Sequence, residues 1–164
     1  MLTLETEISV EGITGSEILD FLLTCTDEEY QRWWPGTHLQ FHTVRRGLGP
    51  HHLGDVVLMD EYIGARRVRL TGVVDRVVPG RVVVYRLRNV IPLPARLSIA
   101  CQDRDGGVAL RHTISAGFGG VGRILDPLLR IFFFSPAFAE AMDEHVRTEF
   151  PLLRDRLLET RAGS

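Results

Sequence analysis

The sequence is poor in cysteine, has almost no excess charge of one sign and contains no long uninterrupted hydrophobic run. Its two cysteines, Cys25 and Cys101, lie far apart and form no C-x-x-C pair, which argues against a disulfide framework and a thiolate zinc site. Because 19 basic residues stand against 21 acidic ones, the net charge of −2 provides no positive field for a phosphate backbone. We therefore expect reduced thiols and no nucleic-acid partner.

No segment has the length or polarity of a membrane span or an export signal. The most apolar stretch, Ile124–Phe138, contains an acidic residue, a basic residue and two prolines, and is shorter than the ~20 residues that cross a bilayer as a helix. Glu5 and Glu7 interrupt the first segment of the chain. We expect a cytoplasmic protein without a transmembrane segment, with one globular domain over residues 1–161 and a disordered tail over residues 162–164.

Seven segments have the apolar and polar alternation, or the β-branched and aromatic content, of strands. Glycine, proline and aspartate clusters separate most of them and predict hairpin connections. The expected strands are Leu2–Val10, Leu39–Arg46, Asp55–Ile63, Arg67–Val78, Arg81–Val90, Arg96–Asp103 and Val108–Ser115.

Helical signals lie between the first two strands and after the last one. Thr14 or Ser16 can cap a short helix, and Thr26 with Glu29 has the form of a capping box that opens a second one. From Ile124 to Leu157 apolar residues recur at helical spacing, with a break near Ser135-Pro136. The pattern predicts a long, interrupted C-terminal helix, and Pro127 and Pro151 should kink it.

Short motifs lie at the junctions between the predicted helices and strands. They are Trp33-Trp34-Pro35-Gly36, Gly54-Asp55, Asp105-Gly-Gly107 and Ala116-Gly-Phe-Gly119. With these motifs the chain resembles the START/Bet v 1-like superfamily of polyketide cyclases and lipid-transfer proteins. The resemblance implies an α+β helix-grip fold, in which a seven-stranded antiparallel sheet wraps around the C-terminal helix. It also implies an internal cavity for a lipid, polyketide, steroid or hormone, and in some members a cyclase activity. The fold alone does not choose among these.

Charged residues on the strands indicate which side chains face such a cavity. Arg67, Arg69, Arg86, Arg88 and Arg111 should face water, which sends their apolar neighbours inward. The ligand-binding residues predicted in this way, together with aromatic residues at the cavity mouth and residues of the closing helix, are Trp33, Trp34, Tyr85, Leu87, Leu110, His112, Ile114, Met142 and His145.

His112 is the first polar candidate, since a histidine among apolar neighbours can bind a ligand or act as an acid or base near neutral pH. A core histidine satisfied by a neighbouring group is the alternative. His38 and His42 resemble a metal motif, but on an extended strand they lie roughly 13 Å apart and cannot share one ion. Leu39 and Phe41 compete for the inner face, so we expect both histidines outside unless a bulge turns one inward.

His145 and Glu149 are i, i+4 neighbours on the closing helix, a spacing that suits either a hydrogen-bonded pair or two metal ligands. With Asp60 or Glu61 and His112 they could form a metal or acid–base site. An exposed pair that stabilises the helix is the simpler interpretation. We predict no metal and no cofactor.

Three functions remain open at this point. The leading hypothesis is a carrier or sensor of a hydrophobic small molecule. The second is a cyclase or hydratase-like enzyme in which His112 or His145, with Asp60 or Glu61, transfers protons. The third is an interaction module, in which the apolar row Ile131–Phe134 anchors a homodimer. The same row could instead form a lid or a tip that touches a membrane.

Overall fold

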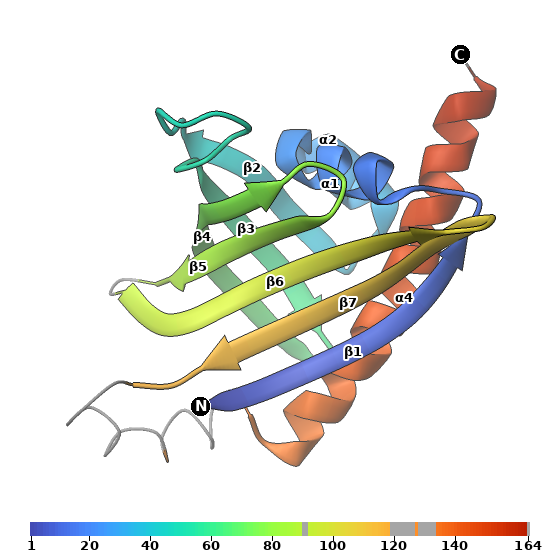
Figure 1. The fold of residues 1–164 in the computed structure, drawn as a ribbon. Helices are drawn as coiled ribbons and strands as arrows, with labels where there is room; N and C mark the ends of the chain where they lie inside the picture. The colour runs from blue at the N-terminus through green and yellow to red at the C-terminus, as the bar shows by residue number, and fades with distance from the viewer. Residues whose placement is uncertain (90–91, 119–126, 128–133, 164) are drawn as a thin grey trace.

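The computed structural model describes residues 1–89, 92–118, 127 and 134–163. In this part of the chain, seven antiparallel strands form one sheet in the order β1-β7-β6-β5-β4-β3-β2, and a long helix crosses one face of it (Figure 1). The predicted α+β helix-grip architecture is confirmed. The strands are β1 (Leu2–Glu11), β2 (His38–Arg45), β3 (Val56–Ile63), β4 (Arg66–Val78), β5 (Val82–Arg88), β6 (Pro92–Arg104) and β7 (Gly107–Ala116).

Strands β2 to β7 follow one another in the sheet, and short turns connect them except between β2 and β3, where residues 46–55 form a longer loop. The β4–β5 turn requires glycine at position 80, where the backbone has φ of +69°. A Cβ atom at Gly80 would also lie 2.6 Å from the hydroxyl oxygen of Ser16. Glycine therefore permits both the turn and the close approach of the helix that contains Ser16.

Two short helices, α1 (Gly15–Thr24) and α2 (Asp27–Trp33), lie between β1 and β2. Thr14 caps α1 and Thr26 caps α2, each in a reciprocal capping box with the glutamate three residues later. These boxes satisfy backbone N–H groups that the first helical turn leaves free. The Thr26 box agrees with the prediction from sequence.

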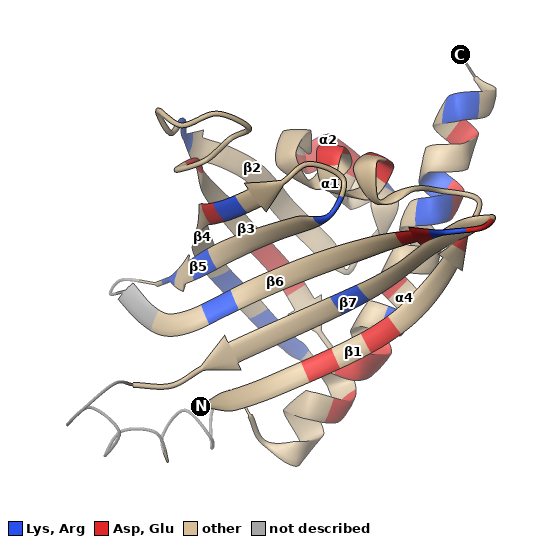
Figure 2. Ribbon diagram, in the orientation of Figure 1, with Lys and Arg blue, Asp and Glu red and all other residues tan. Residues whose placement is uncertain are grey.

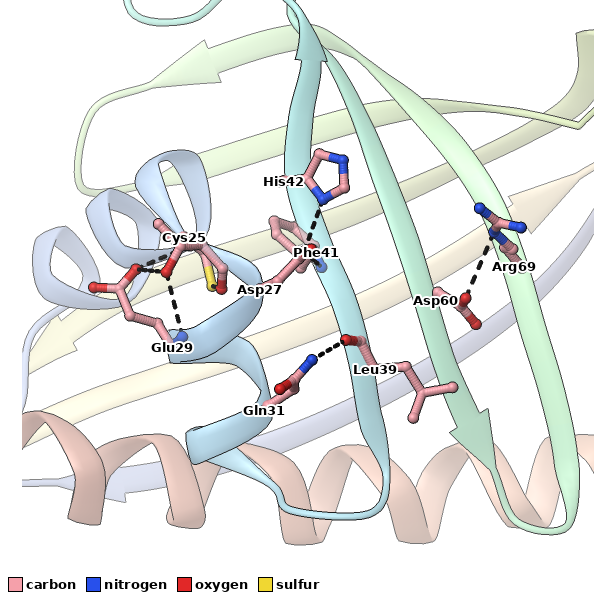
Figure 3. A network of polar contacts seen from close by, with 10 residues as sticks. Cys25, Asp27, Glu29, Gln31, Leu39, Phe41, His42, Asp60 and Arg69 are labelled. Atoms are coloured by element: carbon pink, nitrogen blue, oxygen red, sulfur yellow. Dashed lines mark hydrogen bonds and ion pairs between the residues drawn. The ribbon is translucent and has the colours of Figure 1, made fainter.

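Side-chain bonds hold α2 against β2 (Figure 3). The Asp27 carboxylate accepts the backbone N–H of Phe41 at 2.8 Å, and the amide of Gln31 donates to the backbone carbonyl of Leu39 at 2.8 Å. The inner side of α2 is thereby held over the first residues of β2, where the polar site described below begins.

The closing helix α4 (Pro136–Ala162) begins where the sequence indicated a break. Ser135 is its N-cap and accepts the backbone N–H of Phe138 at 3.2 Å. The helix continues past Pro151 and ends one residue beyond the predicted domain boundary. The helical segment expected before Ser135 lies outside the described residues except for Pro127, and residue 164 lies outside them as well. No helix in the described ranges combines the length and apolar character that a bilayer crossing needs.

The two faces of the sheet differ in polarity. On the outer face, acidic residues of β1 lie beside a basic residue of β7, and Arg111 pairs there with Glu7 (Figure 2). On the inner face Val83 and Tyr85 are fully buried. The alternation inferred from the charged residues is therefore confirmed for these strands. Both cysteines are buried and unpaired.

Candidate functional site

An apolar cavity lies between the inner face of the sheet, α2 and α4. Its volume of about 110 Å³ is comparable with that of a dry protein cavity that holds one benzene ring. Apolar side chains make up most of the wall, and those from strands β3 to β7 include Met59, Leu70, Leu87, Leu97, Ile99 and Ile114.

Tyr85 is one of the residues that line the cavity, and its side chain ends in a hydroxyl group. Its oxygen is buried and has no hydrogen-bond partner among the described residues. Burial raises the pKa of this phenol above its usual range, so the hydroxyl keeps its proton at neutral pH. An unpaired buried hydroxyl is unfavourable, and a ligand atom that bonded to it would remove that cost.

The cavity also has a polar end, formed by Glu61 of β3 and by His145 and Glu149 of α4. Nε2 of His145 lies 3.1 Å from Oε2 of Glu61, and the hydroxyl of Tyr30 donates to the same oxygen at 2.8 Å. Burial alone would lower the pKa of His145, but the hydrogen bond to Glu61 and the charges of Glu149 and Glu61 raise it to about 9. His145 is therefore protonated at neutral pH and donates to Glu61.

Glu61 is ionised despite its burial. Burial alone would raise the pKa of its carboxyl group, whereas the hydrogen bond and charge of His145, the charge of His38 and the hydrogen bond from Tyr30 lower it below its usual value. Because the cavity beside it is apolar, a charge-assisted pair of this kind is stronger here than on the surface.

His38 joins this polar end, so its predicted position on the outer face is wrong. Its side chain is 1% exposed and stacks on the ring of Tyr30 at a centroid distance of 3.8 Å. The pairing of β2 with β3 shifts between His38 and Gln40, which marks an irregularity of the kind that re-aims a side chain. The bulge left open by the sequence is thus what turns His38 inward.

Four ligand-type side chains converge as a result. Nε2 of His38 lies 3.4 Å from Oε1 of Glu149 and 3.7 Å from Oε2 of Glu61, and Nε2 of His145 lies 3.8 Å from Oε2 of Glu149. One nitrogen or oxygen atom from each of His38, Glu61, His145 and Glu149 lies within 4.8 Å of all the others. His145 and Glu149 are buried, so the alternative of an exposed helical pair is wrong.

No family profile matches the chain, and no curated protein matches it in sequence. Among solved structures, a protein from Thermus thermophilus aligns with a TM-score of 0.63 and 12% identity over 97% of this chain and 99% of its own. The Zhui aromatase/cyclase from a Streptomyces species aligns at 0.56 and 16% over 97% and 93%, and Ara h 8.0201 at 0.53 and 14% over 90% and 98%. The chain has the Bet v 1-like helix-grip fold.

Most of the predicted ligand-binding residues lie on the cavity wall of this helix-grip fold. These are Trp33, Tyr85, Leu87, His112, Ile114, Met142 and His145. Two others lie elsewhere: Trp34 packs its ring 4.9 Å from that of His145, and Leu110 is buried in the core. Whether the wall residues bind a ligand remains a prediction.

Asp60 and Glu61 point to opposite sides of β3, and only Glu61 reaches the cavity. Asp60 is fully buried on the outer side, where both of its oxygens accept hydrogen bonds from Arg67 at 2.9 and 2.8 Å. Arg69 contributes a further ion pair at 3.5 Å (Figure 3). This geometry removes Asp60 from any acid–base site in the cavity. His42 lies outside as predicted and pairs with Asp27 at 2.7 Å.

His112 lines the cavity apart from the four convergent side chains. Burial lowers the pKa of its imidazole, although the carboxylates of Glu149 and Glu61 act in the opposite direction. It is therefore neutral at pH 7 and offers a ligand one hydrogen-bond acceptor or donor. It cannot act as a strong acid there.

Tyr30 is a functional candidate that the sequence did not single out, whereas Glu149 was considered there together with His145. Tyr30 lies one residue after the glutamate of the α2 capping box, and with α2 bonded to β2 its position carries it into the core. Of the row Ile131–Phe134, residues 131–133 lie outside the described part of the chain, and Phe134 lines the cavity.

Proposed function

We propose that the protein binds a hydrophobic small molecule in this cavity, as a carrier or a sensor. The observation that carries the proposal is an apolar cavity lined in part by Tyr85, whose buried hydroxyl has no hydrogen-bond partner among the described residues. An apolar ring would gain roughly 25 cal/mol for each Å² that it buries there. A ligand oxygen would also give Tyr85 a hydrogen-bond partner. The aromatase/cyclase and Ara h 8.0201 named above share the fold and support a role of this general kind.

The size of the cavity limits the ligand. A volume of about 110 Å³ holds one ring-sized group, so a larger molecule must keep part of its body outside or displace wall residues. We propose a ligand with a ring-sized apolar end and an oxygen atom that reaches Tyr85. Native mass spectrometry of the protein purified from its own source tests this directly, because a bound metabolite adds its mass to the chain.

Two neighbouring residues of β6 provide a matched pair of variants. Leu97 lines the cavity, whereas its neighbour Ser98 belongs to the other face of the sheet. With 1-anilinonaphthalene-8-sulfonate as the fluorescent probe, Leu97→Trp should weaken binding at least about tenfold because the indole occupies the space, and Ser98→Trp should not. Equal affinity in both variants would show that the probe does not enter the cavity.

A cyclase or dehydrase-like enzyme is the second candidate. It is favoured by the protonated His145, which lies beside the apolar wall and is paired with Glu61. An imidazolium in that place can protonate a carbonyl oxygen of a polyketide-like substrate. His145→Gln should then abolish conversion of a poly-β-ketone analogue, followed by chromatography, while His112→Gln tests the other candidate. No conversion by the unmodified protein would leave the carrier role alone.

A further inference from the structure

The imidazole of His38 is held in an arrangement that suits a metal ligand. Its Nδ1 lies 3.2 Å from the backbone carbonyl oxygen of Tyr30, and because that oxygen can only accept, Nδ1 carries the proton. In the neutral ring this leaves a lone pair on Nε2. That atom is buried and has no hydrogen-bond partner among the described residues.

The surroundings of Nε2 make a lone pair there unfavourable. The nearest charged oxygens belong to Glu149, at 3.4 Å, and to Glu61, at 3.7 Å. Lone pairs and carboxylate oxygens repel one another, and an unpaired buried nitrogen adds the cost of its lost hydration. A proton on Nε2, or a metal ion between these atoms, would remove both costs. We propose that His38, Glu61, His145 and Glu149 bind one divalent transition-metal ion, for which Zn²⁺ is the best match.

The dimensions of the cluster fit such an ion. In a tetrahedral zinc site with ligands at about 2.0–2.1 Å, neighbouring ligand atoms lie about 3.4 Å apart. The four nitrogen–oxygen distances in the cluster are 3.1, 3.4, 3.7 and 3.8 Å. The 3.4 and 3.8 Å distances join the two different oxygens of Glu149, and the set of one ligand atom from each residue lies within 4.8 Å. The widest pair of ligand atoms must therefore close by up to about 1.4 Å when the ion binds.

The chemistry of the four groups also selects the ion. Two imidazoles and two carboxylates are ligands that zinc and its transition-metal neighbours accept, and the two carboxylates neutralise a charge of +2. His145, which is protonated in the ion-free cluster, must release the proton of Nε2 when the ion binds. Mg²⁺ and Ca²⁺ require six or more oxygen ligands and are poorly served by imidazole. The buried cysteines take no part in the cluster.

A second layer of contacts supports the ligands. Tyr30 orients His38 through its backbone carbonyl and Glu61 through its hydroxyl, and Trp33 donates from Nε1 to the backbone carbonyl of Glu149 at 2.7 Å. Metal-binding histidines commonly donate their other N–H to a carbonyl, which fixes the ring and the tautomer. The same contacts hold the four groups together in the absence of an ion.

The proposed ion would lie at the polar end of the cavity, since Glu61, His145 and Glu149 also line it. A ligand with a ring-sized apolar end and a carboxylate, phenolate or ketone oxygen could place that oxygen on the ion as a fifth ligand, an expansion that zinc tolerates. Metal binding itself does not depend on the proposed function, because it requires only the four side chains.

The test uses the full chain, stripped with EDTA and dialysed, and titrated with Zn²⁺ in a calorimeter. One ion per chain is expected, and Co²⁺ in its place should give the intense visible absorption of a tetrahedral site. His38→Gln should weaken Zn²⁺ binding by more than about a hundredfold, beyond the range typical of supporting residues. The matched control is His42→Gln on the same strand, whose imidazole points outward and should be dispensable.

Two further results decide the matter if His38→Gln fails to fold. Glu149→Gln has the same shape and should also abolish tight binding, and Tyr30→Phe should weaken it roughly 10–100-fold. Folded protein that takes up no ion would overturn the proposal and leave the four side chains as a buried polar cluster. Uptake that is equal in the wild type, His38→Gln and Glu149→Gln would also overturn it. Both outcomes are independent of whether the fluorescent probe enters the cavity.

Discussion

Removing one oxygen atom from Tyr30 tests how strongly the buried polar cluster is stabilised from within. Tyr30 is 2% exposed, and its hydroxyl donates to the ionised Glu61 at 2.8 Å. The Tyr30→Phe variant keeps the ring, and with it the stack on His38, but loses this charge-assisted bond. Hydrogen bonds to charged groups contribute about 1.5–3 kcal/mol, so the free energy of unfolding should fall by that amount.

Urea unfolding at neutral pH, followed by circular dichroism in the presence of EDTA, measures this change without a contribution from bound metal. Tyr62→Phe, on the same strand as Glu61, is the matched control because its side chain is 37% exposed and the change should stay within about 0.5 kcal/mol. A loss below about 0.5 kcal/mol for Tyr30→Phe as well would refute the reasoning, since Glu61 would then not depend on Tyr30.

Three further changes test other parts of the fold by the same unfolding measurement. Asp55→Asn should cost about 1–3 kcal/mol at pH 7. Burial alone would raise the pKa of Asp55, but hydrogen bonds from Gly47, His52 and Arg46 lower it. The stabilisation by the Asp55 carboxylate is therefore fully present above about pH 4 and is lost as the pH falls through the lowered pKa. A difference in unfolding free energy between Asp55→Asn and the wild type that does not change with pH would contradict this. Phe150→Ala should cost about 3–5 kcal/mol because this ring is 1% exposed, and a loss near 1 kcal/mol would mean that the core closes around the gap. Thr26→Ala should cost about 0.5–2 kcal/mol through the α2 cap, and no loss would show that α2 is held by its bonds to β2 alone.

The architecture could be predicted from the sequence because its signals are local. Turn residues such as Gly80 mark the ends of strands, and Thr26 with Glu29 marks the start of α2, so each element could be located from a few neighbouring residues. Alternation along the strands then determined which side chains face inward. The arginine residues made that assignment unambiguous for β4, β5 and β7.

The polar site was harder to predict because it depends on contacts between distant segments. The inward turn of His38 depends on an irregular pairing with β3, and regular alternation would place it outside. Glu61 and Asp60 could not be separated until the register of β3 was known, and they lie on opposite faces. The pairing of His145 with Glu149 follows from helical spacing, but their burial follows from α4 packing over β3.

The order of strands in the sheet has a consequence for how the protein folds. The first strand pairs with the last, so that Leu2 lies opposite Ala116, and β1 has no other neighbour among the described strands. During synthesis β1 therefore stays unpaired until nearly the whole sheet has left the ribosome. The loss of chain entropy on closing such a long loop comes before the contacts between β1 and β7 can offset it, so we expect slow folding. We also expect β1 to stay accessible to chaperones in the nascent chain until β7 has been synthesised.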